Sequence, residues 1–212
     1  MILSDMDRLP RLIVSAALVL AACAGSFLVA RGHHKPFSTG APAFRQLGPA
    51  DAKVVIVEFS DFECPACRIA EAPMRGLLKL YDGKVRLVFK HFPLERMHRF
   101  ARTGAIAAEC AGRQGKFWEF HHELYDHQNE WTGEKSEERL AVYAVKVKLD
   151  SAAWLACRKD PAVSLAVTAD FKDGMNAWVG STPTFFINGK RFVGALQLSE
   201  RGTPYVDKEL KK

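Results

Sequence analysis

Residues 54–80 read VVIVEFSDFECPACRIAEAPMRGLLKL, and this stretch decides the fold of the chain. Its first part, residues 54–62, opens with four consecutive β-branched residues, which is the pattern of a strand buried on both faces of a sheet. Its second part, residues 69–80, has apolar side chains at roughly helical spacing, at Ile69, Pro73, Leu77 and Leu80. The stretch therefore predicts a buried strand followed by a helix, with a Cys-Pro-Ala-Cys motif where the helix begins.

The motif Cys64-Pro65-Ala66-Cys67 is placed for redox chemistry. Pro65 suits the first position of a helix, where its missing N–H costs nothing. Cys64 would then lie at the helix N-terminus, where free backbone N–H groups and the helix dipole favour an anion. We therefore predict a depressed pKa for Cys64 as the attacking thiolate, with Cys67 as the resolving thiol one turn further along. Because Pro65 and Ala66 carry no charge or side-chain donor, we expect the helix dipole and the backbone N–H groups to supply most of the shift.

Two other interpretations of the motif are weaker. A CxxC motif can be half of a zinc site, but such sites usually need a second CxxC or an HxxxH at fixed spacing, and the sequence contains neither. It can also be an inert bridge, but the preceding strand and the internal proline argue against this. The remaining histidines show mixed spacing and no acid at a ligand offset, so we predict surface or core roles and no metal for His91, His98, His121, His122 and His127.

The composition is that of an ordinary globular protein. The chain has 212 residues, of which 48% are hydrophobic and 25% charged, which fits one domain or one domain with an insertion. The net charge of +6 is scattered, with no basic run beyond the tail at residues 208–212. This pattern indicates a solvated surface and argues against nucleic-acid binding.

The N-terminus carries an export segment. Residues 12–30 are apolar and uncharged between Arg11 and Arg31, and their number is about that of a membrane span. We interpret residues 1–30 as a signal peptide or a membrane anchor. Leu20-Ala21-Ala22-Cys23 resembles a lipoprotein lipobox, in which Cys23 would become the lipidated residue. The apolar run continues past Cys23, however, and this suits a retained anchor better. Lipidation, anchoring and ordinary cleavage all place the rest of the chain in the periplasm or another extracytoplasmic compartment, where disulfides persist.

The segments around the central stretch complete a sheet domain with an insertion. Residues 31–50 are rich in Pro and Gly and read as a linker, and residues 51–96 hold the first half of the sheet domain. Residues 84–92 alternate apolar and basic side chains, which predicts a second strand and a right-handed βαβ unit with parallel strands. Residues 97–178 are helix-like, and we expect their aromatic side chains to form the core of the insertion, including Phe117, Trp118, Phe120 and Trp178.

Local signals place several boundaries. Ser136 and Asp150 are expected as helix N-caps, and Pro161 as a first helical residue. In the second half of the sheet domain, residues 179–212, we expect a buried strand at 185–187, a hairpin turn at Asn188-Gly189, a returning strand at 191–195 and a closing helix at 203–212.

Three segments together resemble the DsbA-like branch of the thioredoxin superfamily. They are EFSDFECPAC, AAECAGRQGKFWEFHHEL and STPTFFINGK, and they lie between residues 54 and 195. The resemblance implies an α/β thioredoxin fold with an inserted all-helical subdomain, and a cis peptide bond at Pro183 beside the active cysteines. A cis bond there would expose the backbone of Thr182 to pair with a substrate peptide as an added strand. The alternative is an ordinary trans Pro183 at the first residue of a strand.

Three further residues are assigned expected roles. Cys110 and Cys157 both lie in predicted helices of the insertion, and in an oxidising compartment such a pair is expected to bridge, as it does in some DsbA-like proteins. Two buried free thiols are the alternative. Glu58, inside the first strand, is a candidate proton relay for Cys67; otherwise it faces solvent or pairs with a lysine.

These observations predict an exported thiol:disulfide oxidoreductase. It would pass the Cys64–Cys67 disulfide to reduced secreted proteins through a mixed disulfide on Cys64, and need no cofactor beyond that disulfide. The resemblance implies reoxidation by a quinone-linked membrane protein, and we expect a monomer. The alternatives are a disulfide reductase or isomerase kept reduced by a membrane electron donor, and a thioredoxin-fold chaperone or binding module.

Overall fold

The structure is a computed structural model that describes residues 37–212. The predicted signal or anchor, the lipidation of Cys23 and the first part of the linker therefore lie outside the described residues. Within residues 37–212, no helix has the length and apolar character needed to cross a membrane.

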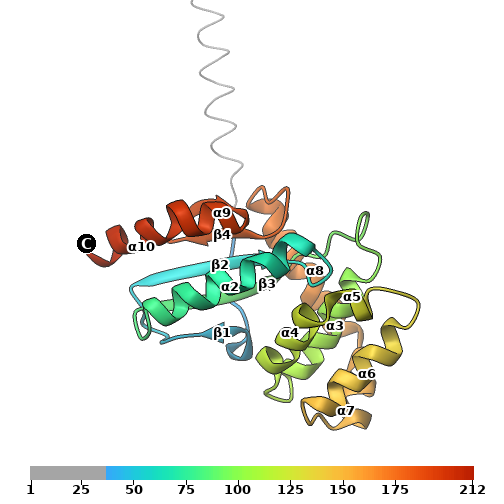
Figure 1. The fold of residues 1–212 in the computed structure, drawn as a ribbon. Coiled ribbons are helices and arrows are strands. Elements are labelled where there is room, and N and C mark those ends of the chain that lie inside the picture. Colours follow the sequence, from blue (N-terminus) through green and yellow to red (C-terminus); the bar gives the residue numbers. More distant parts are fainter. Residues whose placement is uncertain (1–36) are drawn as a thin grey trace, which may run out of the picture. The chain divides into compact units, whose positions relative to one another are not determined.

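A mixed five-stranded sheet forms the centre of the fold (Figure 1). Its strands are β1 (Gln46–Leu47), β2 (Val54–Ser60), β3 (Val85–His91), β4 (Thr184–Ile187) and β5 (Lys190–Val193), in the spatial order β1-β3-β2-β4-β5. β2 and β3 pair in parallel, and the other three pairs are antiparallel. β2 lies in the middle with six of its seven residues buried, which explains its continuous apolar run. The predicted βαβ unit is confirmed, because α2 (Pro65–Leu80) connects β2 to β3.

Different helices pack against the two faces of the sheet. Val54 and Ile56 of β2 pack in one cluster with α2 and with α10 (Thr203–Leu210). Val57 and Phe59 point to the opposite face and belong to a second cluster, against which Phe171 of α8 (Pro161–Asn176) packs. Because side chains alternate along a strand, this assigns the even-numbered residues of β2 to the side on which α2 lies.

The buried face of α2 differs from the predicted one. The buried residues are Cys67, Ala70, Glu71, Met74 and Leu77. Ile69 and Leu80, which were expected to face the core, are 63% and 65% exposed. The predicted and the observed buried stripes share Leu77 but are offset by about one residue around the helix. The buried stripe is the one that packs Ala70 and Met74 in the cluster with the sheet.

Helices fill the segment between β3 and β4. They are α3 (Ala101–Gly112), α4 (Phe117–Asp126), α5 (Gln128–Trp131), α6 (Ser136–Lys146), α7 (Ser151–Arg158) and α8. Figure 1 shows α4 to α7 gathered on one side of the sheet, with α8 returning toward β3. Most aromatic side chains of the insertion are buried as expected, but Trp178 is exposed, because it follows α8 in a left-handed turn with φ 58°.

The helix boundaries follow local chemistry with one shift. Asp150 caps α7 by accepting the backbone N–H of Ala153, and Pro161 is the first residue of α8, as predicted. Ser136 was expected to be an N-cap, but it is already the first helical residue of α6, and Lys135 occupies the cap position.

The C-terminal part closes the sheet. Asn188 and Gly189 both have positive φ, as a two-residue type I′ hairpin requires, and they join β4 to β5. The returning strand ends at Val193, two residues before the predicted end, because Gly194 turns the chain into α9 (Gly194–Gln197). A short π-helix, η2 (Leu198–Gly202), then leads into the expected closing helix α10. Part of the predicted linker is ordered as η1 (Ala43–Arg45) and β1.

Candidate active site

The fold brings the Cys-Pro-Ala-Cys motif against the segment that enters β4. Cys64 is the N-cap of α2 and Pro65 is its first residue. The Cys64 Sγ donates a hydrogen bond to the carbonyl oxygen of Thr182, 3.5 Å away, and the Thr182–Pro183 peptide bond is cis. Cys67 lies one turn deeper and is fully buried, and its Sγ accepts the backbone N–H of Asp61 at 3.5 Å. Both thiols are free in this structure.

The two thiols have pKa values shifted in opposite directions. Hydrogen bonding from Cys67 lowers the pKa of Cys64 to about 6, and it outweighs burial, which acts in the other direction. The side chain of Thr182 and the backbone N–H groups of Cys67 and Ala66 lower the Cys64 pKa further. Burial raises the pKa of Cys67 well above its usual value, and the neighbouring Cys64 adds to this. Cys64 is therefore the thiolate at neutral pH, while Cys67 keeps its proton.

The main cause of the lowered pKa of Cys64 differs from the one we expected. We expected the helix N-terminus to supply most of it, but the largest contribution is the hydrogen bond from Cys67, and the backbone N–H groups follow behind Thr182. The Thr182 hydroxyl is itself buried and has no hydrogen-bond partner within the described part of the chain when Cys64 is a thiol. It is therefore available to donate to the thiolate.

Glu58 lies behind the cysteines rather than on the surface. It points to the α2 side of β2 and is buried, and burial raises the pKa of its carboxyl to about 7, although a hydrogen bond with Ser60 opposes the rise. Hydrogen bonding with Ser60 also lowers the pKa of Cys67, so the same hydroxyl acts on both Glu58 and Cys67. The Ser60 hydroxyl lies 2.9 Å from the phenol oxygen of Tyr125 in α4.

The sequence analysis did not predict two of these neighbours, Ser60 and Tyr125. Ser60 could have been predicted from the strand pattern, because it lies two residues beyond Glu58 on the same face of the strand. Tyr125 could not, because it comes from an inserted helix 65 positions away from Ser60.

A buried carboxylate organises the loop in front of Cys64. One carboxylate oxygen of Asp61 accepts the backbone N–H of Leu94 and the Nδ1 of His98, both at 2.8 Å. Burial alone would lower the pKa of His98, but the hydrogen bond and the negative charge of Asp61, with the charge of Cys64, raise it overall. His98, predicted to have a surface or core role, therefore lies beside the active site, where Asp61 and Cys64 favour its charged form.

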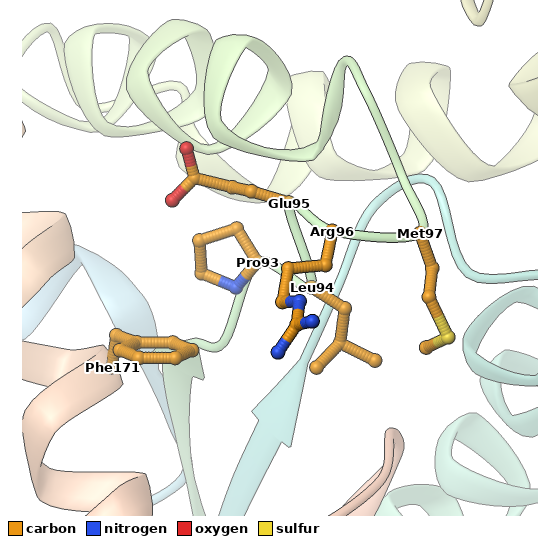
Figure 2. A pocket seen from close by; sticks show the side chains of 6 residues that line it. All are labelled: Pro93, Leu94, Glu95, Arg96, Met97 and Phe171. Atoms are coloured by element: carbon orange, nitrogen blue, oxygen red, sulfur yellow. The ribbon is translucent and has the colours of Figure 1, made fainter.

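An open hollow adjoins this loop (Figure 2). Its volume is about 650 Å³, and it is lined by Pro93, Leu94, Glu95, Arg96, Met97 and Phe171. Figure 2 shows the ring of Phe171, from α8, on one side and the side chain of Met97 on the other. Because the backbone N–H of Leu94 donates a hydrogen bond to Asp61, the lining of the hollow contacts the segment that precedes the cysteines.

Cys110 and Cys157 form a disulfide that joins α3 to α7, with a sequence separation of 47 residues. The bridge lies within the inserted helices, and neither of its cysteines belongs to the Cys-Pro-Ala-Cys motif.

One group of side chains within residues 37–212 has ligand atoms close enough to share a metal ion. It consists of Glu71 from α2 with His121 and His122 from α4. Glu71 lies 50 residues before His121 in the chain and meets the two histidines only in the folded structure, so the sequence pattern did not indicate this group.

Comparison with known proteins places the chain in a family. A family model described as thioredoxin matches residues 41–203. The structure of a thioredoxin-like oxidoreductase from Silicibacter pomeroyi is similar with a TM-score of 0.66 and 29% identity, over 79% of this chain and 92% of that one. BdbD from Bacillus subtilis, in its oxidised form, shares the fold with a TM-score of 0.69 and 23% identity, over 84% of this chain and 100% of that one.

Curated relatives match in sequence over part of their length. The Na(+)/H(+) antiporter NhaA 1 of Salinispora arenicola is 38% identical over 151 residues, which are 71% of this chain and 22% of that protein. The chain thus spans about a fifth of the length of the curated relatives it matches. From the family model and the shared fold, the chain belongs to the thioredoxin superfamily and has the fold of its DsbA-like branch.

Proposed function

We propose that the chain is an exported thiol:disulfide oxidoreductase that transfers the Cys64–Cys67 disulfide to reduced proteins. One observation carries the proposal: Cys64 has a pKa lowered to about 6 at the start of α2, and Cys67 beside it has a raised pKa. A pair with this asymmetry has one good leaving group and one protonated resolving thiol, which is what stepwise thiol–disulfide exchange needs.

The exchange balances in two steps. A substrate thiolate attacks the Cys64 Sγ of the oxidised enzyme, the Cys64–Cys67 bond breaks, and Cys67 leaves with the electron pair and takes up a proton. A second substrate thiolate then attacks the substrate sulfur of the mixed disulfide, and Cys64 leaves as a thiolate. The substrate loses two electrons and the enzyme gains them. We assign Glu58 as the source of the proton that Cys67 takes up. The proton would pass through the hydroxyl of Ser60, whose hydrogen bonding lowers the pKa of both groups.

Two surfaces are proposed to hold the substrate protein. The backbone of Thr182 lies beside Cys64, where an extended peptide can pair with it as an added strand. The hollow between residues 93–97 and Phe171 is lined largely by apolar side chains, including the exposed Met97, and would accept an apolar side chain of the same peptide.

The compartment and the partners are part of the same proposal. The apolar run at residues 12–30 and the Cys110–Cys157 bridge both suit a compartment in which disulfides persist, and residues 1–30 would export or tether the chain there. The family resemblance supports a quinone-linked membrane protein as the reoxidising partner, and we expect the chain to act as a monomer.

Trapping the intermediate tests this function. The Cys67→Ala variant, mixed with a peptide that contains a disulfide, should accumulate a stable mixed disulfide on Cys64, because the resolving thiol is gone. The Cys64→Ala variant should form none and should lose all activity in oxidising a reduced, unfolded protein. If Cys64→Ala acts like the wild type, the cysteines serve only to staple the helix and the chain is a binding module.

A further inference from the structure

We infer that Glu71, His121 and His122 form a binding site for a transition-metal dication of the zinc type. Glu71 comes from α2 and the two histidines from α4, and one ligand atom from each lies within 4.8 Å of the other two. The Glu71 Oε1 is 3.7 Å from the His121 Nε2. These three residues do not take part in the exchange reaction proposed for Cys64 and Cys67.

His121 is the residue that points most directly to a ligand. Its side chain is 2% exposed, and neither ring nitrogen has a hydrogen-bond partner in the described part of the chain. A neutral imidazole always keeps one N–H and one lone pair, and burying both unpaired is unfavourable. Aromatic rings pack around it, among them those of Phe62 and Trp118, and neither of these residues forms a hydrogen bond with its ring nitrogens. A metal ion would take up that lone pair.

A small cavity lies where the ion would bind. Its volume is about 20 Å³, and its lining includes all three ligand residues together with Glu58 and Arg75. A space of that size holds roughly one water-sized particle. Glu58 and Glu71 both line the cavity, and their carboxylates would balance the charge of a dication, while Arg75 opposes it with a single positive charge.

The donor set selects the metal. Two imidazoles and one carboxylate form a ligand set that zinc uses in proteins, whereas calcium and magnesium prefer six or more oxygens. Zinc bonds of about 2.0–2.2 Å place neighbouring ligand atoms roughly 3.3 Å apart, so Glu71 and His121 would need to close by a few tenths of an ångström. His122 is partly exposed, which leaves its ring room to turn inward. The bound ion would tie α2, the helix that carries the cysteines, to α4 of the insertion.

Isothermal titration of zinc chloride into the full-length chain tests the site. The protein is used with its Cys64–Cys67 disulfide closed, so that these thiols do not compete for the metal. Glu71→Gln replaces the carboxylate by a neutral amide of the same shape, and His122→Ala removes the imidazole of the less buried of the two histidines. We expect each to weaken zinc binding by more than the roughly tenfold that loss of an outer-sphere partner costs, and we expect calcium to give no binding signal.

The matched control is His127→Ala, which removes a partly exposed histidine at the C-cap of the same helix. It should bind zinc as the wild type does. Any zinc held elsewhere on the chain is common to all variants and drops out of the comparison. A second readout is thermal unfolding, where zinc should raise the Tm of the wild type and of His127→Ala but not that of His122→Ala. Coincident isotherms for wild type and His122→Ala, or no uptake by the wild type, would overturn the site.

Discussion

At the scale of single residues, Thr182 presents two groups to Cys64. Its carbonyl oxygen accepts a hydrogen bond from the thiol, and its hydroxyl is available to the thiolate. Both groups come from a position 118 residues away from Cys64 in the chain. The redox properties of the motif therefore depend on the segment that enters β4 as well as on the start of α2.

The Thr182→Val variant tests this dependence. Valine has the shape of threonine without the hydroxyl, so we expect the pKa of Cys64 to rise and the disulfide to become less oxidising. The pKa is measured from the ultraviolet absorbance of the thiolate as a function of pH. Thr184→Val is the control, because it also removes a buried hydroxyl from this segment, one that bonds to Ser181 rather than to a cysteine. An unchanged pKa in Thr182→Val would contradict the assignment.

The lowered pKa of Cys64 also predicts how the stability of the reduced protein depends on pH. The folded pKa is about 6 and the ordinary value is 9.0, so the folded state binds fewer protons than the unfolded state between these limits. Stability from Cys64 is then fully present above pH 9, decreases as pH falls, and is lost below pH 6. Cys67 has a raised pKa and keeps its proton in both states below pH 9.

Denaturant unfolding at several pH values checks this dependence. We expect the free energy of unfolding of the reduced wild type, relative to that of Cys64→Ser, to increase from pH 6 to pH 9. Other titrating groups are shared by the two proteins and cancel in the difference. A difference that does not change over this range would mean that Cys64 is an ordinary thiol.

The sequence allowed part of this residue-scale chemistry to be predicted. Cys64 and Cys67 were identified because a helix start and a CxxC spacing are local patterns. The largest influences on Cys64 were harder to foresee, because hydrogen bonds from Cys67 and Thr182 depend on side-chain geometry and tertiary contact. The same holds for His98, whose partner Asp61 lies 37 residues earlier in the chain.

At the scale of elements, the Cys110–Cys157 bridge holds α3 against α7. The bridge closes a loop of 47 residues, which in the chain-entropy model stabilises the folded state by about 4 kcal/mol. We expect the double variant Cys110→Ala, Cys157→Ala to lose about that much free energy of unfolding in denaturant. It should keep its thiol-oxidising activity, because Cys64 and Cys67 are untouched. A loss well below 1 kcal/mol would mean that the bridge does not constrain the unfolded chain.

Element types were predicted better than element faces. The β2–α2–β3 unit and the Asn188-Gly189 hairpin follow from local pattern and turn chemistry. The predicted buried face of α2 was wrong by about one residue. Two apolar stripes run along the helix, and only contact with the sheet determines which of them is buried. Local spacing contains no information about that contact.

At the scale of the whole molecule, the fold collects three segments around the cysteines, two of them distant in the chain. The turn after β2 supplies Asp61, the loop after β3 supplies Leu94 and His98, and the segment before β4 supplies Thr182. The family resemblance predicted the thioredoxin fold with its helical insertion, and the segment with Pro183. It did not predict the hollow beside the loop, because Phe171 reaches that loop only through the packing of α8.

The measurement that tests the central claim most directly is the reduction potential of the Cys64–Cys67 pair, obtained by equilibration with glutathione. A Cys64 thiolate stabilised at neutral pH favours the reduced form, so the disulfide should be a strong oxidant. We predict a potential closer to the value of about −120 mV for DsbA than to the value of about −270 mV for thioredoxin. A potential near or below about −270 mV would contradict the account and make the chain a reductase that needs an electron donor.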